Sequence, residues 1–138
     1  MTRRFDSVDD LLADARSRLS RLRPDAASGE IRAGARLVDI RPSWQRRHEG
    51  EIPGSLVVER NHLEWRLHPR SADRVPLAVE GQRWIVFCSA GYTSSLAADS
   101  LLSLGIPATD IVGGFTAWRA LGLPTVEGGT PIEHIVPE

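Results

Sequence analysis

The chain has 138 residues, with 41% hydrophobic and 25% charged side chains, which suits a single globular domain with a core of its own. The formal net charge of -1 does not favour general nucleic-acid binding, and the single cysteine, Cys88, excludes an internal disulfide and a multi-cysteine metal site. No apolar run approaches the roughly 18 residues that a membrane span needs. Because a lone thiol suits a reducing compartment and no apolar stretch follows the basic start, we expect a cytoplasmic protein without a signal peptide.

The first predicted element is a helix from Val8 to Leu22, where apolar side chains recur at helical spacing. Ser7 can cap this helix, acidic residues follow in its first turn, and Pro24 ends it. Residues 25–33 predict a second short helix. Residues 1–29 are therefore expected to form a helical extension that packs on the main domain.

Short apolar runs then alternate with helical segments along the chain. The predicted strands are residues 36–40, 56–58, 84–87 and 110–112, and the predicted helices are 43–48, 61–67, 94–104 and 115–121. This alternation predicts an α/β fold with a central, mostly parallel sheet and helices on both faces. Sites in such sheets form beyond the carboxyl ends of the strands, and Cys88 lies at one of these ends.

Cys88 ends the strongest predicted strand and opens a tight loop that leads into a helix. Backbone N–H groups at a helix start lack intrahelical partners and can form a nest for an anion, and such positions lower the pKa of thiols. Cys88 is therefore a candidate nucleophile, although it is also compatible with a small buried apolar residue. The candidate anion-binding residues are Ser89, Ala90, Gly91, Tyr92, Thr93 and Ser94, among which Gly91 supplies conformational freedom and the others include four hydroxyls.

Four motifs occur in chain order: Leu37-Val38-Asp39-Ile40-Arg41, Gly50-Glu51-Ile52-Pro53-Gly54-Ser55, the cysteine loop, and Gly113-Gly114-Phe115-Thr116-Ala117-Trp118 followed by Gly122-Leu123-Pro124. Together they resemble the rhodanese family over about residues 30 to 126. The resemblance implies a rhodanese-like three-layer sandwich over residues 30–126. Because the chain from Gly122 onward is rich in Gly and Pro, residues 127–138 are expected to form an irregular tail.

For activity, the resemblance implies a sulfurtransferase. Cys88 would take a sulfane sulfur from a donor such as thiosulfate or a persulfide on a small molecule or protein, and would pass it to a thiol or to cyanide. This covalent chemistry calls for no metal, organic cofactor, nucleic acid or membrane.

The cysteine loop departs from the family pattern in its charge. Thr93 stands where the family has an arginine, and Ser89 stands at a second position that is often arginine, so the loop has no formal positive charge. This should weaken the binding of a dianion such as thiosulfate, because charge-assisted hydrogen bonds are the strong ones. Arg60 and Arg66, which follow the second strand, are the expected external anion contacts. Asp39 and Arg41 are expected to support the loops at the strand end, which completes the set of candidate site residues.

Three function classes remain open at this point. The first is the sulfurtransferase, and the second is a non-catalytic module that binds a partner or senses sulfur. The third is a phosphatase of the related dual-specificity cell-cycle type, whose loop is one residue longer and closed by an essential arginine. Arsenate reduction on a similar scaffold is a further variant of this third class.

Overall fold

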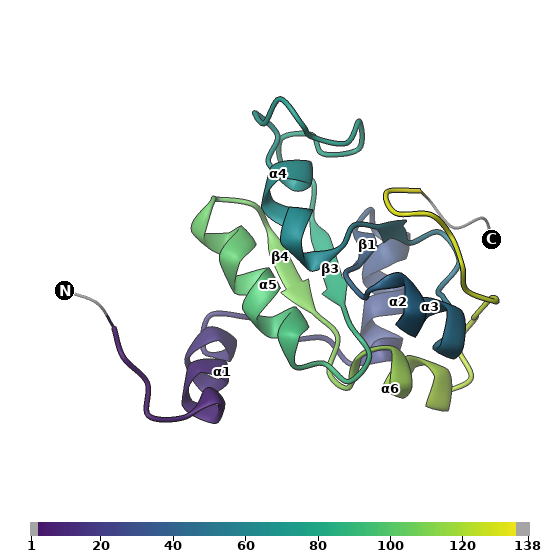
Figure 1. Ribbon diagram of the computed structural model, residues 1–138, viewed down its shortest axis with the longest axis horizontal. Helices are drawn as coiled ribbons and strands as arrows, with labels where there is room; N and C mark the ends of the chain where they lie inside the picture. Colours follow the sequence, from purple (N-terminus) through teal and green to yellow (C-terminus); the bar gives the residue numbers. More distant parts are fainter. Residues whose placement is uncertain (1–2, 135–138) are drawn as a thin grey trace.

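The computed structural model describes residues 3–134 and has a parallel four-stranded sheet at its centre (Figure 1). The strands are β1 (Arg36–Asp39), β2 (Leu56–Val57), β3 (Trp84–Phe87) and β4 (Ala108–Asp110), in the spatial order β2-β1-β3-β4. Every pairing between neighbours is parallel. The expected α/β class with a parallel sheet is confirmed.

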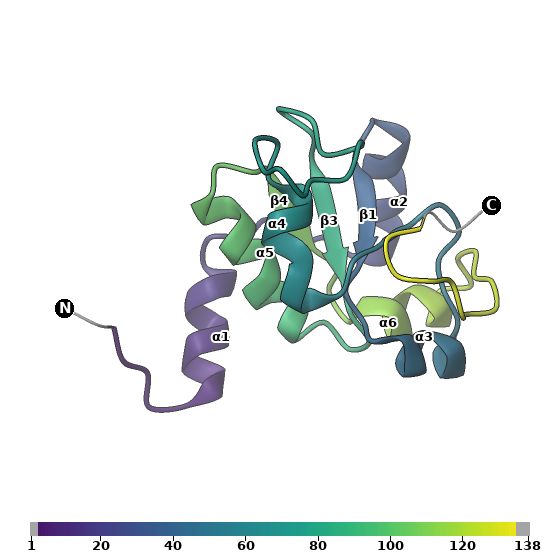
Figure 2. The same cartoon turned by 45° about the horizontal axis from the view of Figure 1, so that its top comes forward.

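Helices cover both faces of the sheet. They are α1 (Val8–Arg16), α2 (Pro24–Arg32), α3 (Ser43–Glu49), the 3-10 turn η1 (Arg60–His62), α4 (Leu63–Leu67), α5 (Thr93–Ser103) and α6 (Gly114–Ala120). In Figure 1, α4 and α5 lie in front of the sheet and α2 lies behind it. Figure 2 shows α3 and α6 beneath the carboxyl ends of the strands and α1 beside α5.

The central strand β3 divides the core between the two faces. Val86 packs with the apolar residues of α4 and α5, whereas Ile85 and Phe87 pack with those of α2 and α6. Side chains alternate across a strand, so Cys88, one residue beyond Phe87, returns to the α4 and α5 face. The sheet therefore fixes the side on which the thiol lies.

The first helix is shorter than its apolar periodicity predicts. Ser7 caps it as expected, accepting a hydrogen bond from the Asp10 N–H at 3.0 Å, but the helix ends at Arg16 and not near residue 22. Beyond this end, Arg18 forms an ion pair with Asp99 of α5 at 2.7 Å. The helical extension is thus docked against α5.

The segment after α1 runs along the sheet edge instead of continuing as a helix. The Leu22 N–H donates to the Asp110 carbonyl at 3.0 Å, and the Val112 N–H donates to the Leu22 carbonyl at 2.8 Å. Leu22 thereby forms a parallel bridge with Ile111 beyond β4. The prediction of a helix to residue 22 is wrong because backbone pairing with a distant segment replaces the last helical turns.

The described part of the tail after α6 contains no helix or strand, and it packs on the domain. Val126 forms an antiparallel bridge with Glu51, with N–H to carbonyl distances of 2.8 Å in both directions. Further along, the Val57 N–H donates to the His134 carbonyl at 3.1 Å, which places the tail on the outer edge of β2. Both open edges of the sheet are thus lined by terminal segments of the chain. Residues 135–138 of the predicted tail lie outside the described residues.

The fourth strand lies earlier than its apolar residues predict. The prediction was residues 110–112, whereas β4 spans Ala108–Asp110. Its pairing with β3 begins at Trp84 opposite Ala108, and Ile111 is used for the bridge to Leu22. In residues 3–134, no helix is both long enough and apolar enough to cross a bilayer.

Candidate functional site

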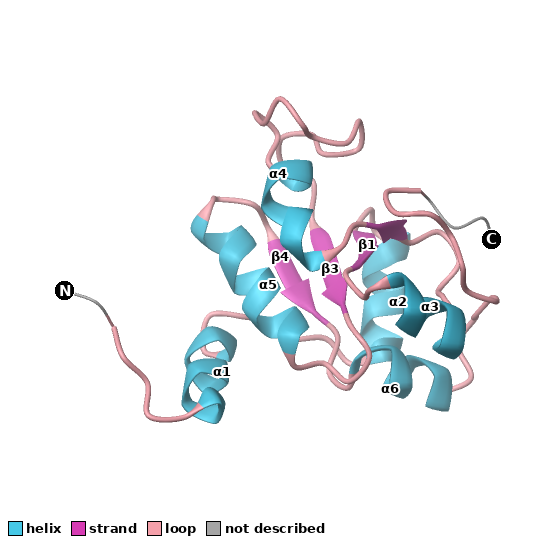
Figure 3. Ribbon diagram, viewed as in Figure 1, coloured by secondary structure: helices cyan, strands magenta, loops and turns pink. Residues whose placement is uncertain are grey.

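The Cys88 loop connects β3 to α5 at the carboxyl edge of the sheet. Figure 3 shows this loop beside the turn that leads into α6. The Cys88 side chain is only 5% exposed, whereas Tyr92 at the loop tip is 65% exposed. The thiol is therefore held close to the protein surface but beneath it.

The amino end of α6 holds the first half of the loop. The Phe115 N–H donates to the Cys88 carbonyl at 2.8 Å, and the Thr116 N–H donates to the Ser89 carbonyl at 3.0 Å. Gly114 permits this approach, because a Cβ at its position would lie 2.4 Å from the Cys88 carbonyl oxygen. Gly114 also has a φ of +58°, in the left-handed region that disfavours other residues. The double glycine before α6 is thus required by the cysteine loop.

Three carbonyl groups of the loop, those of Cys88, Ser89 and Gly91, point outward toward α6 and the helical extension, so the N–H groups of Ser89, Ala90 and Tyr92 point inward. The carbonyl of one residue and the N–H of the next point in opposite directions across a trans peptide, and the described chain has no cis peptide. Gly91, with a φ of +86°, turns the chain so that its carbonyl also faces outward, toward Arg16 and Arg21. Within residues 3–134, no N–H from Ser89 to Ser94 donates to a backbone carbonyl. The inward-facing N–H groups of Ser89, Ala90 and Tyr92 are therefore available as a nest for an anionic sulfur.

Two of the hydroxyls expected to assist this nest are already used. The Ser89 hydroxyl donates to Oε1 of Glu49 at 2.7 Å, and the Ser94 hydroxyl donates to Oδ2 of Asp110 at 2.8 Å. A hydroxyl has one proton, so neither serine can also donate to a bound sulfur or oxyanion in this arrangement. The expected donor role of the Ser89 and Ser94 hydroxyls is therefore corrected. Thr93 and Ala90 are exposed on the loop.

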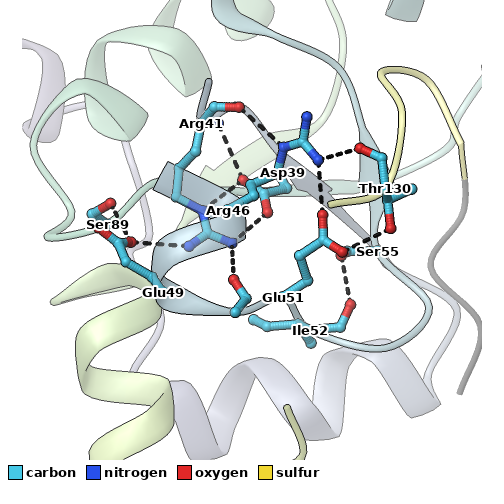
Figure 4. Close-up of polar contacts among 10 residues, drawn as sticks. Asp39, Arg41, Arg46, Glu49, Glu51, Ile52, Ser55, Ser89 and Thr130 are labelled. Carbon is cyan, nitrogen blue, oxygen red and sulfur yellow. Dashed lines mark hydrogen bonds and ion pairs between the residues drawn. The ribbon is translucent and has the colours of Figure 1, made fainter. Parts of the chain in front are cut away.

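Asp39 and Arg41 form a fully buried ion pair behind the loop (Figure 4). Arg41 donates from Nε to Oδ1 of Asp39 at 2.9 Å and from Nη2 to Oδ2 at 2.6 Å. Burial raises the pKa of Asp39 above its ordinary value of 3.8, and the hydrogen bonds from Arg41 counter part of that rise. Arg41 also donates to Glu49 Oε1 at 3.0 Å, and this oxygen accepts the Ser89 hydroxyl. One continuous chain of polar contacts thus links the end of β1 to the cysteine loop.

A second buried ion pair fastens the tail to the same region (Figure 4). Arg46 of α3 donates to Oε2 of Glu51 at 2.8 Å, and both side chains are completely buried. The Thr130 hydroxyl donates to the other oxygen of Glu51 at 2.7 Å, and the Thr130 carbonyl accepts a further hydrogen bond from Arg46. The pair therefore holds the tail and does not face the loop.

The arginines expected to supply an external anion contact are engaged elsewhere. Arg60 forms an ion pair with Glu64 at 2.9 Å, and Glu64 accepts the hydroxyl of Ser100. Ser100 lies about 10 Å along α5 from the loop end at Thr93, given the helical rise of about 1.5 Å per residue. Arg66 forms an ion pair with Glu133 of the tail at 2.6 Å. Local acidic partners thus engage both side chains, and within residues 3–134 neither Arg60 nor Arg66 forms a hydrogen bond with the cysteine loop.

Two other arginines, which sequence reasoning missed, reach the loop. Arg16 donates to the Gly91 carbonyl at 2.7 Å, and Arg21 donates to the same carbonyl at 3.0 Å. They come from the helical extension, 75 and 70 residues away in the sequence. The one available signal was the concentration of arginines at positions 16, 18, 21 and 23, toward the end of the predicted helix and before Pro24.

A well-formed cavity lies away from the cysteine loop. It has a volume of about 540 Å³ and lies where β1 begins, between α2, α6 and the turn before β2. Its lining includes Ile31, Ile52, Trp118 and Pro124. The cysteine loop is at the other edge of the sheet, and a covalent transfer of one atom does not require a large cavity.

Comparison with known proteins identifies the family. The family model of the Rhodanese-like domain matches residues 23–121. The chain belongs to the rhodanese-like domain family. The resemblance inferred from the four motifs is thereby confirmed. A search of curated proteins found no significant match.

Solved structures with the same fold include proteins described in different ways. One is a protein of unknown function and possible tyrosine phosphatase from Rhodopseudomonas palustris CGA009, with 30% identity, a TM-score of 0.79, and coverage of 91% of this chain and 98% of that chain. A thiosulfate sulfurtransferase from Pseudomonas aeruginosa has 26% identity and a TM-score of 0.65 over 83% of this rhodanese-like chain, which spans only 21% of that protein. A rhodanese-related protein from Thermoplasma volcanium shares the fold, with 21% identity, a TM-score of 0.62, and coverage of 77% and 96%.

Proposed function

We propose that this rhodanese-like chain is a sulfurtransferase in which Cys88 carries the transferred sulfur as a persulfide. The observation that supports this most is the loop that follows Cys88, in which three carbonyls are held outward while the N–H groups of Ser89, Ala90 and Tyr92 face inward. Such a nest stabilises negative charge on sulfur without a side-chain cation in the loop. The description of the Pseudomonas aeruginosa relative as a thiosulfate sulfurtransferase agrees with this proposal.

The reaction divides into two balanced transfers. In the first, the Cys88 thiolate attacks the terminal sulfur of a donor persulfide, R–S–S⁻, forming Cys88–S–S⁻ as the donor's S–S bond breaks and R–S⁻ leaves with the electron pair. With thiosulfate, the sulfane sulfur bonds to Cys88 and sulfite leaves. In the second, a thiolate acceptor attacks the terminal sulfur of the persulfide and becomes R′–S–S⁻, or cyanide attacks and becomes thiocyanate, restoring the Cys88 thiolate. No electrons are gained or lost overall, and no metal or organic cofactor takes part.

The charges beside the loop favour a persulfide over thiosulfate as the donor. Thr93 replaces the family's loop arginine, and the hydroxyl of Ser89 is held by the carboxylate of Glu49. A dianion approaching this side meets no loop guanidinium, because the cation on this side, Arg41, is completely buried and already paired with Asp39 and Glu49. We therefore infer that the donor is a small-molecule persulfide or a persulfidated protein, and that the acceptor is a thiol.

The proposal is tested by intact mass spectrometry of the purified protein after incubation with sulfur donors. Thiosulfate, glutathione persulfide, and a cysteine desulfurase supplied with cysteine are tested separately. We expect the mass of one sulfur atom to be gained, to be absent in Cys88→Ser, and to be lost on addition of a thiol or cyanide. The absence of an adduct with all three donors would refute the proposal.

A second candidate is a non-catalytic rhodanese-like module that binds a partner. The observation that favours it is the 5% exposure of Cys88, together with the absence of arginine from its loop. This candidate predicts no sulfur adduct, and iodoacetamide labelling of Cys88 no faster than that of an unfolded peptide with the same sequence.

A phosphatase is the third candidate, because the relative from Rhodopseudomonas palustris is described as a possible tyrosine phosphatase. Here the loop has no arginine, and the two neighbouring arginines, Arg16 and Arg21, donate to an outward-facing carbonyl. Phosphoryl transfer depends on cationic groups that clamp the transferred oxygens. We expect no Cys88-dependent hydrolysis of p-nitrophenyl phosphate, and hydrolysis that Cys88→Ser abolishes would favour the phosphatase instead.

A further inference from the structure

Two guanidinium groups contact the Cys88 loop from outside the segment that defines the family. The family match begins at residue 23, whereas Arg16 ends α1 and Arg21 lies in the segment that follows. Both donate to one atom, the carbonyl oxygen of Gly91, at 2.7 Å and 3.0 Å. The helical extension is therefore part of the immediate surroundings of the loop.

The two arginines differ in how their charge is compensated. Arg21 forms an ion pair at 2.8 Å with Asp110, a fully buried carboxylate that also accepts the hydroxyls of Ser94 and Ser95. Arg16 donates from Nε to the Ser95 hydroxyl at 3.0 Å, and no carboxylate of residues 3–134 lies within ion-pair distance of it. Arg16 therefore brings an uncompensated positive charge to the loop, whereas the charge of Arg21 is balanced.

The peptide between Gly91 and Tyr92 connects that charge to the inside of the loop. Its carbonyl end accepts both guanidinium groups, and its N–H end points the opposite way, into the nest. Hydrogen bonds from ionised donors are about twice as strong as neutral ones, and hydrogen bonds in series polarise one another. A cation at the carbonyl end thus makes the Tyr92 N–H a stronger donor toward an anionic sulfur.

We propose that Arg16 is a positioning residue that supplies, through the Gly91–Tyr92 peptide, the positive charge that stabilises an anionic sulfur on Cys88. In this way the helical extension replaces the arginine that the family carries at the position of Thr93. Arg21, with Asp110, holds the shape of the same loop. This inference rests on the proposed function, in which the anionic sulfur of Cys88 carries the transferred sulfur. The effect of Arg16 on the Cys88 thiolate is nevertheless expected whether or not a sulfur donor is present.

The test measures the rate of Cys88 alkylation by iodoacetamide as a function of pH, in the full chain. Iodoacetamide is uncharged, and Cys88 is the only thiol, so the rate follows the thiolate of this residue. In Arg16→Gln, we expect the midpoint of the profile to move upward by about one pH unit, with a roughly tenfold slower reaction at neutral pH. A midpoint that does not move would overturn the proposal.

Two matched variants separate charge from structure. Arg18→Gln removes ion pairs to Asp14 and Asp99 from the same end of α1, but Arg18 makes no contact with the loop. We expect its profile to match the unchanged protein, while Arg16→Lys, which keeps the charge, restores most of the shift. A shift of equal size in Arg16→Gln and Arg18→Gln, or in Arg16→Gln and Arg16→Lys, would show a structural effect and contradict the proposal.

A charged reagent distinguishes the relayed charge from direct binding of an incoming anion. If Arg16 acts through the peptide on Cys88, then Arg16→Gln slows iodoacetate and iodoacetamide by the same factor. If Arg16 instead binds anions at the entrance, iodoacetate slows selectively, and the proposal is wrong. The outcome is also independent of sulfur transfer: an Arg16 effect without a sulfur adduct refutes only the proposed function, and an adduct without an Arg16 effect refutes only this inference.

Discussion

The two halves of the Cys88 loop are held by different parts of the chain. The first half, Cys88 and Ser89, is held from within the family domain by α6 and by the buried chain of contacts through Glu49 and Arg41. In the second half, Arg16 and Arg21 of the helical extension hold the Gly91 carbonyl, while the Ser94 hydroxyl is held by Asp110 of β4. Behind the first half, the carboxylates of Asp39 and Glu49 balance the guanidinium group of Arg41. Beside the second half, the charge of Arg16 is uncompensated. Arginine thus serves as structural support for the first half of the loop and as a source of positive charge for the second half.

The largest effect is expected from removing the buried cation behind the first half. Arg41→Met leaves Asp39 buried without its partner, and breaking a buried ion pair in this way costs about 3–5 kcal/mol. Urea unfolding followed by circular dichroism measures the loss of stability. The control is Arg23→Met, which removes an exposed ion pair with Asp25 and should leave the unfolding midpoint unchanged. Equal midpoints in the two variants would show that the Asp39 pair does not support the loop.

The contact between α6 and the first half is tested by Gly114→Ala. The added Cβ would meet the Cys88 carbonyl at 2.4 Å, and the positive φ adds strain, so we expect a loss of about 3 kcal/mol together with loss of sulfur uptake. Gly29→Ala is the matched control, since its Cβ meets nothing within 4 Å in the middle of α2 and should stabilise the chain by about 0.5–1 kcal/mol. A Gly114→Ala variant that unfolds like the control would contradict the close approach.

In the second half of the loop, Arg21 is expected to contribute to stability and Arg16 to the charge near Cys88. Arg21→Gln removes the ion pair to the buried Asp110 and should cost about 2 kcal/mol, a typical value for a hydrogen bond to a charged group. Arg21→Gln alone would also leave the charge of Asp110 without a partner, so the charge effect is tested in the double variant Arg21→Gln/Asp110→Asn, which removes both members of the pair. We expect the pH profile of Cys88 alkylation to stay in place in this double variant. Urea unfolding of Arg21→Gln and alkylation of the double variant give the two values. If the double variant moves the profile as far as Arg16→Gln does, the distinction between the two arginines is lost.

The smallest effect concerns an ion pair that contacts neither half. Burial alone would raise the pKa of Glu64, but hydrogen bonds from Ser100 and Arg60 outweigh it and hold the pKa below its ordinary value of 4.5. The stabilisation by Glu64 is therefore complete above pH 4.5 and is lost as the pH falls through the lower pKa of the folded state. We expect the difference in urea midpoint between the unchanged protein and Glu64→Gln to be present at neutral pH and to shrink at about pH 3. A difference that is constant with pH would contradict this.

Much of the fold could be predicted because its signals are local. Short apolar runs bounded by Gly or Pro gave β1 and β3 nearly to the residue, and the Ser7 cap located the start of α1. The end of α1 was missed because Leu22 keeps the helical spacing but pairs with Ile111, far along the chain. The periodicity of apolar residues indicates which side of a helix or strand is apolar, but it does not indicate which distant segment that side contacts.

The candidate site divides in the same way. Cys88 and the glycines around it could be predicted, since a strand, a glycine turn and a helix start follow one another in the sequence. The partners of the loop could not, because Glu49 and Arg16 lie 40 and 75 residues away from the groups that they contact. Arg60 was expected to supply an external charge because it follows a strand, but its side chain is paired with Glu64, one helical turn later.

The pairing of both chain ends along the sheet covers part of each of its edges. Leu22 pairs beyond β4, and Glu133 and His134 pair with Val57 of β2, so within residues 3–134 neither edge is left entirely open to another molecule. Exposed rows of N–H and carbonyl groups are templates for intermolecular β-pairing and aggregation. A fragment trimmed to the matched residues 23–121 would lose both covers at once. Low solubility of such a fragment would then reflect uncovered strands and not a defect of the core.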